Sequence, residues 1–177
     1  MKPKGFLSVS KVLDASGKEI STQRAVDYGW IVPDFRNSLK GWDLQKHEIP
    51  LGENLFCDGG RQLLAFCFGY YAPISSYVCS KFSVGTGTVP AKVTDVALQN
   101  PIEFSAGVTT KTIYGIDCPT AFVARVEFTL GANEANGYLI TELGLFSGND
   151  TLYARRTTTG VNKSSDFSPV ISWRIRF

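Results

Sequence analysis

The sequence predicts a mainly β protein: an antiparallel β-sandwich with one α-helix at about 59–71 and an irregular N-terminal arm. Two observations lead to this fold class. Apolar and polar residues alternate through 121–130, which is the period of a half-buried strand. Short runs of this kind then recur between turn-rich segments up to the end of the chain, a spacing typical of sandwiches and barrels. The alternating apolar face carries Phe122, Ala124, Val126, Phe128 and Leu130.

Three more strands are expected in the C-terminal half. Residues 138–146 are apolar on both faces, which predicts a central strand, and 151–157 follow a turn and pair back as a hairpin. Residues 167–177 form the last strand. Its alternation places Ile171, Trp173, Ile175 and Phe177 inward and Ser172, Arg174 and Arg176 outward.

One helix is predicted between Asp58 and Pro73. Its apolar residues recur at helical spacing and define one buried face. They are Leu63, Leu64, Cys67, Phe68 and Tyr71. A shorter helical turn is expected at 94–98, with Thr94-Asp95 as its cap and Val96, Ala97 and Leu98 in its body.

The N-terminal residues 1–53 follow a different pattern and are assigned to an assembly arm. Residues 9–20 are consistent with a hairpin around 14–18, but no period follows it. Aromatic residues among polar neighbours are typical of a surface that a partner covers. The alternative is an extension that wraps its own domain. The candidate interface residues are Tyr28, Trp30, Phe35 and Trp42.

The segment 82–102 looks at first like a phosphate-binding loop. It has Gly85 and Gly87 after a strand, yet no lysine follows at the required place, and Pro90 stands where a dinucleotide fingerprint needs its third glycine. Proline also removes an amide donor that a phosphate would use. We therefore expect a tight glycine turn, with backbone freedom as the reason for the glycines.

Composition gives no sign of an enzyme, a metal site or a cofactor. The net charge of +2 does not favour nucleic acid as a partner, and no apolar run reaches the length of a membrane helix. The start of the chain is basic without the apolar stretch of a signal peptide. The single His47 lies in a polar stretch, and the carboxylates are scattered. The cysteines lack zinc-ligand spacing and are expected to be reduced core residues, although a disulfide pair stays open. They are Cys57, Cys67, Cys79 and Cys118.

Several short motifs follow one another along residues 54–177. They are 54–65 (Asn-Leu-Phe-Cys-Asp-Gly-Gly-Arg-Gln-Leu-Leu-Ala), 85–90 (Gly-Thr-Gly-Thr-Val-Pro), Thr94-Asp95 with Leu98, Pro101-Ile102, 140–146 (Ile-Thr-Glu-Leu-Gly-Leu-Phe), 152–155 (Leu-Tyr-Ala-Arg) and 170–177. In this order they resemble a module of minor structural proteins from the tail, neck, collar and fibre-attachment regions of tailed bacteriophages. Residues 1–53 carry no such resemblance.

The resemblance implies a virion structural protein that is assembled in the host cytoplasm. Such proteins assemble into symmetric rings, trimers or fibres, so the chain is expected to be a homo-oligomer that binds other virion proteins through its surfaces. Neither nucleic acid nor a membrane is expected as a partner. Two alternatives are a capsid decoration protein and a host-glycan binder, for which Trp30 and Trp42 would suit sugar stacking.

Overall fold

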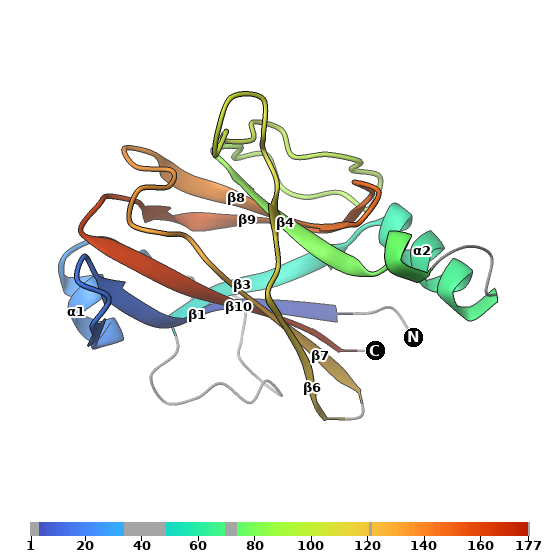
Figure 1. Ribbon diagram of the computed structural model, residues 1–177, viewed down its shortest axis with the longest axis horizontal. Helices are drawn as coiled ribbons and strands as arrows, with labels where there is room; N and C mark the ends of the chain where they lie inside the picture. The colour runs from blue at the N-terminus through green and yellow to red at the C-terminus, as the bar shows by residue number, and fades with distance from the viewer. Residues whose placement is uncertain (1–3, 34–48, 70–73, 121, 177) are drawn as a thin grey trace.

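The computed structural model describes residues 4–33, 49–69, 74–120 and 122–176. The chain folds into two antiparallel β-sheets packed face to face, which confirms the predicted mainly β sandwich (Figure 1). The strands are β1 (Lys4–Asp14), β2 (Glu19–Ile20), β3 (Ile49–Phe56), β4 (Cys79–Gly85), β5 (Lys111–Thr112), β6 (Gly115–Thr120), β7 (Val123–Thr129), β8 (Leu139–Ser147), β9 (Leu152–Asn162) and β10 (Phe167–Arg176). The helical elements are α1 (Thr22–Asp27), α2 (Asp58–Gly69) and a 3-10 turn, η1 (Ile74–Ser76).

Strand β3 joins the two sheets. Its first part pairs with β1, and its last residues, Leu55 and Phe56, pair with Arg155 and Ala154 of β9. The strand order is therefore continuous, β5-β4-β8-β9-β3-β1-β10-β7-β6, with β2 attached to β1. Across the open side, the rings of Phe82 in β4 and Phe128 in β7 stack at 4.1 Å between centroids. This contact joins the two sheets through β4 and β7, which lie near the two ends of the strand order.

The N-terminal strand lies inside the fold rather than beside it. β1 pairs with β10 on one side and with β3 on the other, and Leu7, Val9 and Val12 are fully buried. The expected hairpin is confirmed, because β2 pairs back on β1 with Val12 opposite Ile20. An irregular arm is therefore the wrong description for these described residues. Pairing between the two ends of the chain is non-local, and a pattern read along the sequence does not display it.

The strands predicted in the C-terminal half are present with small shifts. β8 is central, between β4 and β9, as its apolar character on both faces predicted. β10 begins at Phe167, and the inward residues Ile171, Trp173 and Ile175 are buried. Ser172 and Arg174 were expected to face outward, but they are buried as well. β10 lies between β1 and β7, with Ser8 and Glu127 opposite Ser172 on its two sides.

Phe122 is the clear exception to the predicted inward faces. Its side chain is 68% exposed, whereas Val126, Phe128 and Leu130 of the same alternation are buried. β7 begins at Val123, so Phe122 lies in the turn between β6 and β7, beyond the edge of the core. Figure 1 shows this hairpin extending past the body of the sandwich. The predicted inward face therefore began one residue too early, because it included Phe122.

The predicted helix is confirmed as α2, which packs against β9. Leu63 is buried, and Leu64 and Cys67 are partly buried against the main core. A Cβ at Gly60 would lie 2.5 Å from the carbonyl oxygen of Tyr153. The glycine at the start of α2 therefore permits the helix to approach the strand closely.

Candidate functional site

A buried ionic cluster connects motifs that are far apart in the sequence. Nε of Arg155 in β9 donates to Oε1 of Glu142 in β8 at 2.5 Å, and Nη1 donates to Oδ2 of Asp95 at 2.6 Å. Arg155 and Glu142 are 1% and 0% exposed. Nη2 of Arg155 also donates to the carbonyl oxygen of Val89 at 3.1 Å. One guanidinium therefore connects two strands of the sheet to the loop between β4 and β5.

Glu142 holds the same loop from its other end. Its two carboxylate oxygens accept hydrogen bonds from the backbone N–H groups of Gln99 (2.9 Å) and Asn100 (3.2 Å). The hydroxyl of Thr141, the neighbouring residue, donates to the carbonyl oxygen of Gly87 at 3.0 Å. Buried charges are tolerated only when they are paired and hydrogen-bonded. The loop supplies those partners, so the loop and the ion pair depend on each other.

The glycines of the 85–90 motif are explained by this contact. Neither Gly85 nor Gly87 has a positive φ, so backbone freedom is the wrong reason for them. A Cβ on Gly85 would lie 2.5 Å from the carbonyl oxygen of Asn100, and one on Gly87 would lie 2.5 Å from Oε2 of Glu142. The segment is also no tight reversal, because the N–H of Thr86 donates to the carbonyl oxygen of Asn100 and the chain runs on beside 99–102.

The loop covers the outer face of the sheet with apolar residues of its own. Leu98 packs with Cys57, Phe146 and Leu152 in a small cluster separate from the main core. A Cβ on Gly144 would come within 2.8 Å of Leu98 Cδ2. This third layer is why β8 is buried on both faces.

Asp95 does not cap a helix, contrary to the expectation for 94–98. Its carboxylate accepts from the N–H of Lys92 at 2.8 Å and from Arg155, and Val96 is exposed. Burial pushes the pKa of Asp95 upward, but these hydrogen bonds and the positive charge of Arg155 outweigh it, so the pKa lies below its ordinary value. Asp95 is therefore the anionic anchor of this turn.

Sequence reasoning named these residues without relating them. Glu142 and Arg155 stood in two separate motifs, and Glu142 was counted among scattered carboxylates. A carboxylate within an otherwise apolar strand was the one available signal, since a buried acid needs a cationic partner. Which residue serves as that cationic partner depends on the register of β8 and β9, in which Gly144 lies opposite Arg155.

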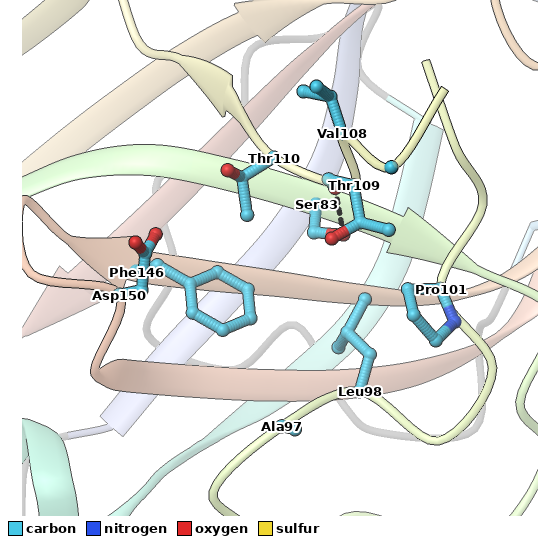
Figure 2. Close-up of a pocket in the computed structure, with 10 residues that line it drawn as sticks. Ser83, Ala97, Leu98, Pro101, Val108, Thr109, Thr110, Phe146 and Asp150 are labelled. Atoms are coloured by element: carbon cyan, nitrogen blue, oxygen red, sulfur yellow. Dashed lines mark hydrogen bonds between the residues drawn. The ribbon is translucent and has the colours of Figure 1, made fainter. Parts of the chain in front are cut away.

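A cavity of about 420 Å³ lies beside the β4–β5 loop that Glu142 and Arg155 hold in place. Figure 2 shows Leu98 and Pro101 of that loop on one side, Val108, Thr109 and Thr110 on another, and the ring of Phe146 between them and Asp150. The hydroxyl of Ser83 is engaged by the carbonyl oxygen of Thr109 at 2.6 Å, and Lys81 pairs with Asp150 at 2.8 Å. The cavity is thus largely apolar, with hydroxyls and one carboxylate at its border.

The candidate interface residues Tyr28 and Trp30 follow α1. Tyr28 is 52% exposed, and its ring lies 5.1 Å from that of Trp30. Trp30 is half-buried and stacks on Phe167 at 4.5 Å with nearly parallel planes. One face of Trp30 is therefore occupied by the core, which leaves less of the indole open to a sugar ring. Phe35 and Trp42 lie outside the described residues, as does His47.

Residues next to Trp30 continue an exposed apolar surface. Ile31 bridges to Val161, and the N–H of Val32 donates to the carbonyl oxygen of Gly160, so Val32 lies beside Gly160. Leu139 lies over the same glycine, since a Cβ there would be 2.7 Å from its Cδ1. Val32 and Leu139 are 44% and 48% exposed. We call Tyr28, Trp30, Val32 and Leu139 the α1-side patch.

The four cysteines are free in the structure, and three of them are at least partly buried. Cys118 is exposed, so the expectation of core cysteines is wrong for that residue. Burial raises the pKa of the Cys57 thiol to about 11 and that of Cys79 to about 12. Among the described residues, no group of three or more His, Cys, Asp or Glu side chains is arranged to hold a metal ion. The described helices include none long and apolar enough to span a membrane.

Comparisons with known proteins add no relative to these observations. No protein-family model, curated protein or solved structure matches the chain.

Proposed function

We propose that this chain is a structural component of a tailed-phage virion, in the neck, collar, tail or fibre-attachment region, and that it acts by binding other virion proteins. The observation that carries the proposal is the α1-side patch. It combines exposed Tyr28 and Leu139 with a half-buried Trp30 on a rigid core contact. Tyrosine and tryptophan are enriched where protein interfaces concentrate their binding energy.

The ionic cluster supports the same proposal. The motifs that resemble virion proteins contribute Asp95, Glu142 and Arg155, whose charged groups satisfy one another and the loop backbone. Arg155 is fully engaged in holding the β4–β5 loop against the sheet. These contacts hold the loop in one place over the outer face of the sheet, and surface loops positioned by a rigid scaffold often carry binding contacts.

Incorporation into particles tests the proposal. Particles from cells that express the chain with its gene neighbours are banded on a density gradient, and the chain is quantified by mass spectrometry. We expect a fixed number of copies in each particle. The double variant Tyr28→Ser/Leu139→Ser is expected to stay folded and to be lost from the particles.

Val78→Ser is the matched control, because it also removes an exposed apolar side chain (41% exposed) outside the patch. The control is expected to band with the particles like the wild type. A wild-type chain that stays in the particle-free fraction would overturn the proposal.

A further inference from the structure

Lys163, the residue after β9, is a buried amine that takes no part in the cluster around Arg155. Its side chain is 1% exposed. Its Nζ donates to the carbonyl oxygen of Ser164 at 2.6 Å, to Oδ1 of Asn136 at 2.9 Å and to the carbonyl oxygen of Ala132 at 3.4 Å. These acceptors are all neutral, and no carboxylate of the described residues forms an ion pair with this Nζ. A buried ammonium without a paired anion is costly, so the site favours the uncharged amine.

The surroundings of Lys163 act on its protonation in the same direction. The centre of the Phe167 ring lies 5.4 Å from Nζ. Burial lowers the pKa of Lys163 below its ordinary value, and the negative charges of Glu134 and Asp166 offset this effect only in part. A lysine that is desolvated in this way is the form of the side chain that serves as a nucleophile.

The carboxamide of Asn136 is the electrophile next to this amine. Its Oδ1 accepts the hydrogen bond from Nζ, and its Nδ2 donates to the carbonyl oxygen of Ala132 at 2.7 Å. Both ends of the carboxamide are therefore held, and Cγ, which is bonded to Oδ1, lies beside the amine. Asn136 is exposed on its other side, so that a small leaving group can escape to solvent.

The backbone fixes the two side chains relative to each other. The N–H of Gly137 donates to the carbonyl oxygen of Lys163 at 2.9 Å, and the N–H of Lys163 donates to that of Tyr138 at 3.0 Å. Ala135 and Gly137, on either side of Asn136, have positive φ values of 53° and 81°. An alanine in this region is uncommon and is typical of a strained, functional turn. The hydrogen bond of Gly137 also disfavours the competing attack of its nitrogen on Asn136.

A proton acceptor belongs to the same turn. Glu134 accepts from the N–H of Gly131 through Oε2 at 2.8 Å and pairs with Lys111 through Oε1. Its negative charge acts on Lys163. A carboxylate in this position is suited to general base catalysis of an attack by the amine.

We propose that Nζ of Lys163 attacks Cγ of Asn136 and forms an intramolecular amide bond, with ammonia as the leaving group. The ammonium group first gives one proton to Glu134. The electron pair of the amine then forms the Nζ–Cγ bond, a second proton moves from Nζ to Nδ2, and the Cγ–Nδ2 bond breaks. The third hydrogen stays on the new amide, and nothing is oxidised or reduced. The bond ties residues 27 apart in the sequence, and it is independent of the assembly role proposed above.

The intact mass of the purified full chain tests the bond directly. The folded wild type, held at mildly alkaline pH, is expected to become lighter by the mass of one ammonia molecule. The same chain kept in guanidinium chloride is expected to retain its full mass, because the site exists only in the folded state. Trypsin should then release a branched peptide in which residues 126–155 are joined to 157–174, since an acylated Lys163 is no longer cleaved.

Three variants test the assigned residues. Lys163→Arg and Asn136→Ala are expected to keep the full mass, and Asn136→Ala is expected to fold because the residue is exposed. Glu134→Gln is expected to slow the loss of ammonia by at least about 100-fold, as for removal of a general base. Lys81→Arg is the matched control, because its amine pairs with Asp150 away from this turn, and it should link like the wild type. Circular dichroism checks the fold of each variant.

Two results would overturn the proposed bond. One is a folded wild type that keeps its full mass throughout the incubation. The other is a loss of ammonia that persists in Lys163→Arg and maps to an unbranched peptide 126–155, which would indicate cyclisation of Asn136 on its own backbone. Glu134→Gln that links as fast as the wild type would overturn the assignment of Glu134 as the base.

Discussion

Nε of Arg155 donates a hydrogen bond to Oε1 of Glu142 at 2.5 Å, and neither side chain is exposed to solvent by more than 1%. This pair fixes the β4–β5 loop at two points. Glu142 also accepts hydrogen bonds from the backbone N–H groups of Gln99 and Asn100, and Arg155 also donates to the carboxylate of Asp95. The geometry of the cavity wall depends on it, since Leu98 and Pro101 belong to the same loop.

Removing one partner of this pair should be strongly destabilising. Arg155→Met leaves the Glu142 carboxylate buried without its cation, and we expect a loss of about 3–5 kcal/mol in the free energy of unfolding, measured by urea denaturation. Lys81→Met is the control. It breaks the ion pair with the largely exposed Asp150 and should cost below about 1 kcal/mol. Equal losses in the two variants would contradict the assigned role of Arg155.

Alanine at a glycine of the 85–90 motif should lower the free energy of unfolding, because its Cβ would clash with neighbouring atoms. Gly85→Ala would place its Cβ 2.5 Å from a backbone oxygen of Asn100, and we expect a loss of about 1–3 kcal/mol in thermal or urea unfolding. At Gly115 of β6 the nearest atom would be 3.7 Å away. Gly115→Ala should therefore be neutral or stabilising by up to about 1 kcal/mol. A neutral Gly85→Ala would mean that the loop does not lie as closely on Glu142 as described.

Acid should weaken the fold partly through Asp95. Its pKa is lower in the folded chain than in the unfolded one, so its contribution is present above the unfolded pKa and is lost as the pH falls through the folded value. Asp95→Asn should cost about 1–2 kcal/mol at pH 7 and make the decline in stability below about pH 4 shallower. Urea denaturation from pH 3 to 7 measures both effects.

Some acid dependence should remain in Asp95→Asn. Hydrogen bonds also hold the pKa values of Asp14 and Asp117 below their ordinary range. Burial pushes the pKa of Glu134 upward, but its hydrogen bonds and the charge of Lys111 outweigh burial and lower it, so all three carboxylates lose their contributions in the same direction. Identical pH profiles for the variant and the wild type would contradict the coupling of Asp95 to Arg155.

Core and tip aromatics should differ sharply in their effect on stability. Trp173 is fully buried in β10, and Trp173→Ala should lower the free energy of unfolding by about 3–5 kcal/mol. Phe122→Ala should change it by no more than about 0.5 kcal/mol, because that ring is exposed in the free chain. A large loss for Phe122→Ala would place the tip in the core, as the alternation first predicted.

Thiol chemistry should separate the cysteines by burial. At pH 8 a water-soluble thiol reagent should label the exposed Cys118 quickly. Cys57 is buried and should react only on unfolding, and the partly buried Cys79 should react far more slowly than Cys118, since burial raises their pKa values to about 11 and about 12. Mass spectrometry of time points identifies the labelled residues. Rapid labelling of Cys57 in the native chain would show that the loop opens from the sheet.

Local patterns predicted the elements well where their own periodicity decides them. β8, β10, α2 and the β1–β2 hairpin follow from alternation, helical spacing and a turn signal. The same patterns did not reveal that β1 pairs with β10, because the partners come from opposite ends of the chain. They also did not reveal the cluster around Arg155, since its members meet only through the register of β8 and β9 and the path of the loop.

The most direct test of the central proposal is the position of the chain in intact particles. Immunogold electron microscopy with an antibody to this chain should place gold at one fixed region of a tailed particle, at the neck, the tail or the base of a fibre. Gold that is confined to material outside the particles, with none on the particles themselves, would contradict a role as a virion structural protein.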